Sequence, residues 1–256
     1  YFATSGYELY YKGIFPHQLG KWNFVLDALY TSPNFSINYF GQGNETPNFD
    51  DDIDLDYNRV KIRTIKASPS LQWFGEQGGS AVIQATFERN QVDKTNGRFI
   101  SEPGVVADDV FDYKNFVDLS AKYSFENYDN VSNPTLGMSF SVLGGYRMNV
   151  EETDRKFPYA EASLGFNYRI STTGNWVLAT LLKGKALFDD KYEFYQSATV
   201  GGDFDIRGFR NQRFSGKQSF YQSTDLRLNL GKIKNGFAPL QYGVFGGFDY
   251  GRVWVQ

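Results

Sequence analysis

The 256-residue sequence predicts an all-β fold, an antiparallel transmembrane β-barrel, and three observations support this prediction. Aromatic residues make up 18% of the chain and there are 26 glycines, a composition typical of sheet proteins. Segments of about ten residues alternate apolar and polar side chains, which is the length and period of a tilted strand crossing a bilayer. Short turns and long loops alternate between these segments, as they do in outer-membrane barrels.

Composition and charge exclude several other classes. The formal net charge is −3, so the broad basic face of a nucleic-acid-binding protein is excluded. The chain has no cysteine, which excludes disulfides and thiolate metal sites, and its one histidine, His17, stands in an expected turn. No apolar run reaches 18 residues, so a transmembrane helix is not expected. No signal peptide precedes the first strand, and we expect the sequence to be part of a longer protein.

About ten segments carry the alternation. In residues 138–149, for example, Phe140 and Val142 face one way while Ser139 and Ser141 face the other. The apolar side is expected to face lipid and the polar side a wet lumen. The segments are residues 7–15, 22–30, 59–71, 81–88, 117–125, 138–149, 160–169, 176–185, 221–230 and 244–250.

One segment departs from the alternation of apolar and polar residues. In residues 59–71 the sequence places Val60 and Ile62 on the outer face, and the phase then slips at Thr64-Ile65. We interpret the slip as a β-bulge, which inserts one extra residue into a strand.

The connections fall into two classes. Short ones are expected at residues 16–18, 75–78, 127–135, 171–174 and 232–238, and mostly longer ones at 33–56, 93–113, 150–156 and 188–217. Short turns on one rim and long loops on the other indicate a membrane barrel. Because lipid offers no hydrogen-bond partners to the backbone, such a sheet has to close on itself.

The loop at about 188–217 contains the most unusual stretch, Gly201-Gly202-Asp203-Phe204-Asp205-Ile206-Arg207-Gly208-Phe209-Arg210. Glycine permits positive φ and close backbone approach, and arginine presents a rigid fork of donors suited to a carboxylate. We expect the loop to fold inward and Arg207 to bind an acid there. Asp225 and Asp249 stand on the inward face of the next two strands. The alternative is that Arg207 is an ordinary solvated charge.

Ile206, Arg207, Gly208 and Phe209 resemble the (V/I)RG(F/Y) motif in the sixth extracellular loop of Omp85-superfamily outer-membrane barrels, the family of the BamA insertase. Asp225 and Asp249 resemble the acids to which that loop arginine docks. The turn from Tyr128-Asp129-Asn130 to Pro134-Thr135-Leu136-Gly137 is similar to the family's DxRDN…PTxG turn but lacks its arginine.

The resemblance implies a barrel of about sixteen strands with loop 6 folded into the lumen. Residues 1–256 would then be a partial barrel domain, from about strand four to about strand thirteen, without the first and final strands.

The resemblance also implies a function. It predicts assembly and insertion of outer-membrane proteins, or polypeptide translocation, at the bacterial outer membrane, without covalent catalysis or a cofactor. The implied partners are outer-membrane lipids and lipopolysaccharide, unfolded outer-membrane proteins and accessory lipoproteins.

Two other functions stay open. Residues 40–46, Phe40-Gly41-Gln42-Gly43-Asn44-Glu45-Thr46, resemble a loop of Omp85-type barrels fused to metallophosphatase or patatin domains. The barrel would then be a membrane anchor or export pore for an enzyme, although a structural turn also explains this segment. The third function is that of a passive porin.

The remaining candidates have simpler explanations. Asp50, Asp51 and Asp52, with Asp54 and Asp56, have the composition of a Ca²⁺ loop or of a solvated acidic loop. Inward charges are most simply a polar lining of the lumen, and they are Glu161, Lys183, Lys185 and Arg227. The sequence has neither a glycine-rich phosphate cradle nor a nucleophile elbow, so no enzymatic site and no metal site are predicted.

Overall fold

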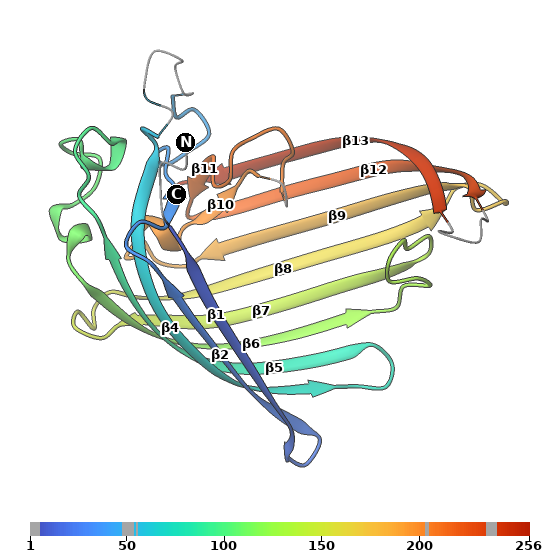
Figure 1. The fold of residues 1–256 in the computed structure, drawn as a ribbon, viewed down its shortest axis with the longest axis horizontal. Helices are drawn as coiled ribbons and strands as arrows, with labels where there is room; N and C mark the ends of the chain where they lie inside the picture. Colours follow the sequence, from blue (N-terminus) through green and yellow to red (C-terminus); the bar gives the residue numbers. More distant parts are fainter. Residues whose placement is uncertain (1–5, 48–53, 55, 203–204, 234–239) are drawn as a thin grey trace.

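A computed structural model describes residues 6–47, 54, 56–202, 205–233 and 240–256. Ten strands lie side by side in chain order in one curved antiparallel sheet (Figure 1). They are β1 (Glu8–Leu19), β2 (Trp22–Thr31), β4 (Arg59–Phe74), β5 (Gly79–Val92), β6 (Lys114–Glu126), β7 (Gly137–Asn149), β8 (Lys156–Arg169), β9 (Trp176–Leu187), β12 (Gln218–Ile233) and β13 (Leu240–Trp254). The predicted all-β, antiparallel architecture is confirmed.

The remaining elements are short and lie in the loops. Strand β3 (Ser36–Asn38) pairs with β4, and β10 (Ala198–Val200) pairs with β11 (Phe214–Gly216). Three 3-10 turns complete the described part of the chain: η1 (Phe99–Ser101), η2 (Asp108–Phe111) and η3 (Phe194–Gln196). None of the described helical segments is long and apolar enough to cross a membrane.

The strand register gives the sheet an apolar outer face and a polar inner face. Residues paired across neighbouring strands lie on the same face of a sheet. One such row on the inner face is Ser139, Gly165, Leu181, Ser223 and Asp249. The row beside it, on the outer face, is Met138, Phe166, Thr180, Thr224 and Phe248. Large apolar side chains on the outer face are exposed, among them Leu119, Val142 and Phe248.

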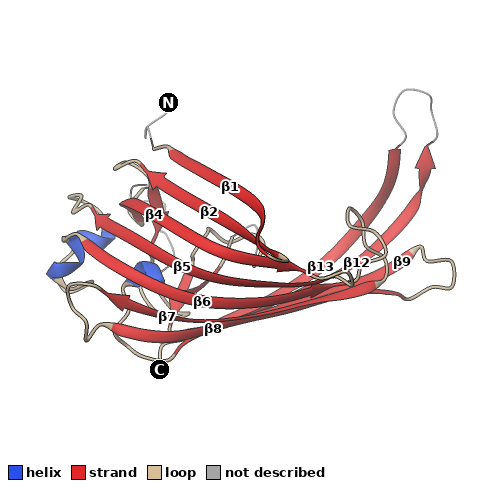
Figure 2. Ribbon diagram, turned by 90° about the horizontal axis from the view of Figure 1, so that it is seen from below, coloured by secondary structure: helices blue, strands red, loops and turns tan. Residues whose placement is uncertain are grey.

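The two rims differ as predicted (Figures 1 and 2). On one rim, short connections join β1 to β2, β4 to β5, β6 to β7 and β8 to β9. The opposite rim carries the three long connections, after β2, β5 and β9, and the six-residue connection from β7 to β8, together with β3, β10, β11 and the 3-10 turns of the described residues. Within the described residues β1 pairs only with β2 and β13 only with β12, so the sheet is not closed.

The predicted bulge in β4 is wrong. The register between β4 and β5 runs without a shift from Ile62 to Phe74, and Thr64 and Ile65 lie within it. Val60 and Ile62 instead point inward, against the expectation that they face out, and both are buried. Apolar residues lie on the inner face in the N-terminal part of β4 and on the outer face in its C-terminal part. The reason is that the N-terminal part covers a hydrophobic cluster rather than a wet lumen.

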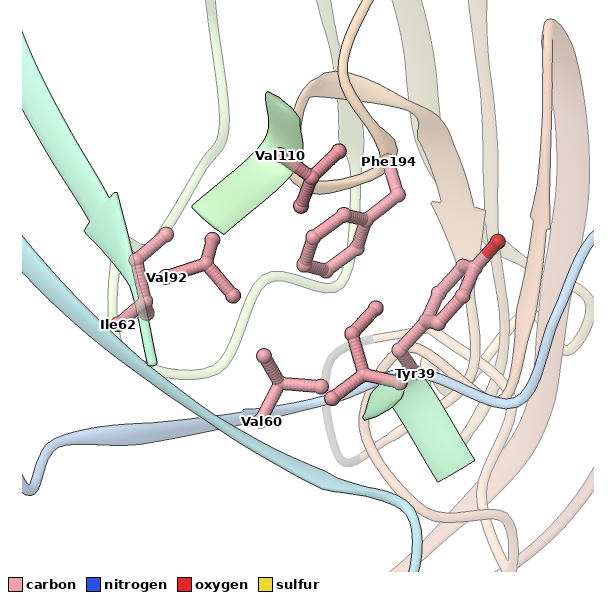
Figure 3. Packing of buried hydrophobic residues seen from close by; sticks show 7 residues of the cluster. Tyr39, Val60, Ile62, Val92, Val110 and Phe194 are labelled. Atoms are coloured by element: carbon pink, nitrogen blue, oxygen red, sulfur yellow. The ribbon is translucent and has the colours of Figure 1, made fainter. Parts of the chain in front are cut away.

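This cluster lies at the loop-bearing rim and packs the long loops against one another (Figure 3). Tyr39 comes from the loop after β2, Ile100 and Val110 from the loop after β5, and Phe194 from the loop after β9. The buried members are Tyr39, Val60, Ile62, Val92, Ile100, Val110 and Phe194. The loops are thus part of a packed cap whose burial of apolar surface fixes their positions.

Candidate functional site: the Arg207 loop and its carboxylates

The loop between β9 and β12 folds back onto the inner face of the sheet and forms a small two-stranded hairpin. Strands β10 and β11 hold the two limbs together, and the backbone N–H of Gln212 donates to the carbonyl of Gly201 at 3.1 Å. Gly201 has φ of +121°, and a Cβ there would lie 2.7 Å from the carbonyl oxygen of Arg210. Only glycine allows this backbone conformation and this close approach of the two limbs.

Arg207 lies at the tip of the loop and binds both predicted carboxylates. Its Nε and Nη2 atoms donate to the two carboxylate oxygens of Asp249, each at 2.7 Å. Its backbone N–H donates to Asp249 as well, at 3.1 Å. Nη2 also lies 2.8 Å from Oδ1 of Asp225. This is the bidentate geometry in which an arginine–carboxylate pair is strongest.

Solvent reaches the two partners unequally. The Asp249 side chain is 8% exposed, whereas that of Arg207 is 39% exposed. The hydrogen bonds to Asp249, and then that to Asp225, raise the pKa of Arg207 above its ordinary value. Asp249 is therefore a shielded anion whose charge is balanced by one guanidinium, and removing that guanidinium would leave it uncompensated.

The neighbours of Arg207 in the motif seat the loop tip. Ile206 is buried and packs with Val200, Tyr221 and Val253. Gly208 adopts φ of +86°, which favours glycine, and the ring of Phe209 meets that of Phe214 edge-on at 5.3 Å between centroids. The guanidinium carbon of Arg207 stands 6.0 Å from the centre of the Phe245 ring.

Two glycines of β13, Gly247 and Gly251, complete the site. A Cβ at Gly247 would collide with the carboxylate of Asp225 and the guanidinium of Arg207. A Cβ at Gly251 would collide with Ile206 and would lie 2.9 Å from Val200. Glycine at alternate positions around Asp249 was the available signal, because an inward glycine marks a close approach by another segment.

The other candidate residues have local partners. Asp50, Asp51 and Asp52 lie outside the described residues. Asp54 and Asp56 lie 3.7 Å and 3.4 Å from Arg98, and Asp56 lies 2.8 Å from Arg59. Within the described ranges no group of three or more histidine or acidic side chains could hold a metal ion. His17 lies near the end of β1, where its backbone N–H donates to Asn23 at 3.0 Å.

Two of the four predicted lumen charges contact each other. Lys185 lies 3.9 Å from Glu161 across the β8–β9 pair, so the two belong to the inner face. Lys185 also donates to the carbonyls of Gln196 and Ser197, both at 3.3 Å, and thereby holds the start of the Arg207 loop against the wall. Lys183 and Arg227 also belong to the inner face, because they pair with Ser163 and Phe245 there.

The turn between β6 and β7 obtains an arginine from the neighbouring hairpin. Arg169, the last residue of β8, donates to Asp129 and to Thr135, both at 2.8 Å. Asp129 also accepts from the backbone of Thr135 at 2.9 Å and of Leu136 at 3.0 Å. The hydrogen bond from the Thr135 hydroxyl and these backbone bonds lower the pKa of Asp129. The arginine that the DxRDN…PTxG pattern has within the turn is absent here, and Arg169, 40 residues after Asp129, takes its place in space.

We predict that Asp129→Asn speeds amide hydrogen exchange at Thr135 and Leu136 while the rest of the sheet keeps its protection. Because the folded state lowers the pKa of Asp129, its stabilisation is present above about pH 4 and is lost as pH falls below that value. The mutant and wild type should therefore converge in acid. Asn133→Ala in the same turn is the control, and equal exchange in both variants would contradict the assignment.

A buried ion network joins three loops on the opposite rim. Lys114 at the start of β6 lies 2.7 Å from Asp109 and 2.6 Å from Glu193, and its side chain is 3% exposed. Arg155 lies 2.6 Å from Asp109 and 2.9 Å from Glu193. The hydrogen bond from Lys114 lowers the pKa of Asp109. Two cations and two anions in alternation satisfy one another, and the loop carrying Glu193 leads directly into β10.

We predict that Glu193→Gln raises amide exchange in residues 188–197 by roughly tenfold while the sheet stays folded. The glutamine keeps a hydrogen-bonding oxygen but removes one of two charges facing Lys114, a loss of about 1–2 kcal/mol. Exchange measured by mass spectrometry checks this, with Asp108→Asn as control, because Asp108 is exposed and its ion pair is with Lys94 rather than with residues 188–197. Unchanged exchange would show that the network does not hold this loop.

The comparisons with known proteins support the fold. No curated protein matches the chain. Among solved structures it is similar to the crystal structure of BamA from Haemophilus ducreyi lacking POTRA domains 1–3, with 16% identity and a TM-score of 0.62. The match covers 91% of this chain and 46% of that one, so the chain spans less than half of that protein. At this identity the likeness shows the fold alone.

A family model places the chain more specifically. The model described as haemolysin secretion/activation protein ShlB/FhaC/HecB matches residues 113–256, which is more than half of the sequence and includes both the Arg207 loop and the two strands that bind it. The chain belongs to the ShlB/FhaC/HecB family of the Omp85 superfamily.

Proposed function

We propose that this chain is part of a bacterial outer-membrane barrel that moves unfolded polypeptides across or into the membrane, with the Arg207 loop as its internal plug. The observation that carries the proposal is the docking of Arg207 on Asp249 and Asp225, with all three hydrogen bonds to Asp249 no longer than 3.1 Å. A loop held on the inner face of the sheet by an ion pair would act as a plug, and breaking the ion pair would release it. Family membership supports polypeptide handling as the activity.

The two faces of the sheet support a membrane location. The outer rows are mostly apolar and exposed, as lipid-facing rows of a barrel are, and the inner rows are mostly polar or glycine. Outer-membrane lipids and lipopolysaccharide would contact the outer face. Because an open edge is not viable in lipid, further strands of the same protein would pair with β1 and β13 and close the wall.

In the proposed mechanism no covalent bond is made or broken by the protein. Release of Arg207 would open a polar path along the inner face for an extended polypeptide. The alternative path lies at the seam of the closed barrel, where an exposed strand edge could template an incoming strand by β-augmentation. The first path gives translocation and the second gives insertion into the bilayer.

The two other functions have less support. The segment that suggested a fused enzyme, residues 40–46, is engaged in contacts with the Arg207 loop and β13, so a structural role accounts for it. A passive porin would leave its lumen open, whereas here the loop tip is ion-paired to the wall.

Reconstitution of the full-length protein in liposomes tests the proposed function. An unfolded secreted polypeptide or an unfolded barrel protein is presented on the side of the short turns, and protease protection follows its fate. Protection of the first inside the vesicle shows translocation, and a membrane-embedded fragment of the second shows insertion. Failure of both, together with a large steady ionic conductance, would contradict the proposal and favour a porin.

A further inference from the structure

The Arg207 loop is held at a second place, by a segment that is far from it in sequence. Residues 38–46, which we call the clasp, begin at the last residue of β3 and lie against the return limb of the loop, residues 211–215. The backbone N–H of Asn38 donates to the side chain of Gln212, and the Asn38 amide donates to the carbonyl of Asn211, both at 3.0 Å. The N–H of Gly43 donates to the carbonyl of Ser215 at 2.8 Å.

Arg213 of the return limb inserts into the clasp. Its Nη1 donates to the hydroxyl of Thr46 at 2.6 Å, and its Nη2 to the carbonyl of Thr46 at 2.8 Å. The guanidinium carbon also lies 4.9 Å from the centre of the Phe40 ring and 4.8 Å from that of Phe214. Arg213 is only 6% exposed. A buried guanidinium sandwiched by two rings and bonded to a backbone carbonyl is a strong, directional attachment.

Asn44 fastens the clasp to β13 itself. Its side-chain nitrogen donates to the carbonyl of Val253 at 2.7 Å, and its side-chain oxygen accepts from the N–H of Val253 at 2.9 Å. The amide thus makes the same pair of bonds that a peptide group of a neighbouring strand would make. Val253 is four residues after Asp249 on the same strand, and it is packed against Ile206 of the loop tip.

The other end of the clasp is anchored in the opposite wall. Strand β3 pairs with β4, and Tyr39 is buried in the hydrophobic cluster at the loop-bearing rim. The clasp therefore joins the β4 side of the sheet to the return limb and to β13. Movement of the loop out of the lumen would separate residues that the clasp ties to a fixed wall.

We propose that the clasp is a second latch on the Arg207 loop, and that Asn44 and Arg213 are positioning residues that keep Arg207 on Asp249. This inference rests on the proposed function only in that the loop is a plug, and it names what controls its release. Opening of the loop then needs two events, separation of Arg207 from its carboxylates and separation of the return limb from the clasp.

Hydrogen exchange of the full-length protein in lipid nanodiscs tests the proposal. The N–H of Arg207 donates to Asp249 and therefore reports docking of the tip directly. Asn44→Ala and Arg213→Gln are each expected to speed exchange at this amide by about tenfold. Arg213→Gln removes hydrogen bonds that hold the return limb in the clasp, and Asn44→Ala removes the two that hold the clasp on β13. Glu45→Ala is the matched control, since Glu45 is exposed and has no hydrogen bond or ion pair among the described residues.

The alternative is a merely local role for the clasp. In that case exchange in Asn44→Ala and Arg213→Gln would rise only within residues 38–46 and 211–215, with the amide of Arg207 unchanged, and the proposal would be overturned. Adding Asn44→Ala to Arg207→Ala should increase loop exchange beyond that of either single variant. These readouts do not depend on transport, so a protein that fails to move polypeptides would contradict the proposed function while leaving this test intact.

Discussion

Replacing Arg207 with alanine is expected to free the loop tip and to increase its open population by about 100-fold. Two side-chain hydrogen bonds to Asp249 and one ion pair to Asp225 are lost together. The backbone bond can persist, and the side chain of Arg207 is partly exposed, so we take about 3 kcal/mol for the whole interaction rather than the sum of its parts. Hydrogen exchange in residues 198–216 measures the opening, and the steady ionic conductance of the protein in a bilayer should rise with it, because the plug leaves the lumen.

A double-mutant cycle separates the ion pair from general damage. Arg207→Ala and Asp249→Asn are each expected to open the loop, while the double variant should open it little further, because both remove the same interaction. Arg207→Lys should behave more like alanine than like wild type, since a lysine cannot make the bidentate contact. Additive effects of the two single changes would show that Arg207 and Asp249 act independently. Heat-dependent gel mobility confirms that each variant is folded.

Gly247→Ala is expected to disturb the same lock without removing any of its charges. Asp225 pairs directly with Gly247 in the sheet, and an added methyl group would occupy the space of the Asp225 carboxylate and the Arg207 guanidinium. Both are tips of side chains that can turn away, so the sheet should fold normally while the ion pair loses its geometry. We expect loop exchange to rise by about tenfold, as for the loss of one charge-assisted hydrogen bond.

Gly246→Ala provides a matched control one residue away. Gly246 lies on the outer face, and a Cβ there meets no atom within 4 Å. It should leave both loop exchange and transport unchanged. If Gly246→Ala and Gly247→Ala gave equal effects, the cause would be the strand backbone rather than the lock.

Much of the fold could be predicted from the sequence because the signal is periodic and local. Each strand alternates apolar and polar residues with period two, and the two classes of connection differ plainly in length. The same alternation placed Asp225 and Asp249 on the inner face beside the Arg207 loop. The alternation could not predict contacts across the lumen, because such contacts join residues far apart in sequence, such as Asn44 and Val253.

The errors and omissions have the same origin. The alternation predicts Val60 and Ile62 on the outer face because apolar residues of a barrel usually face lipid, yet the interior of this rim is filled by a hydrophobic cluster. The arginine of the β6–β7 turn comes from Arg169, which lies on a different hairpin. The sequence of residues 40–46 indicates only a turn or a family resemblance, because nothing local shows that Arg213 reaches them.

The most direct test of this account is a cysteine scan along β7 in the full-length protein in liposomes, because the described sequence has no cysteine of its own. Spin labels at residues 138–147 report collision with oxygen, which concentrates in lipid, and with a water-soluble nickel complex. We predict period two, with Phe140 and Val142 in lipid and Ser139 and Ser141 in water. Uniform exposure to water, or oxygen access at the serine positions, would contradict a membrane wall with this orientation.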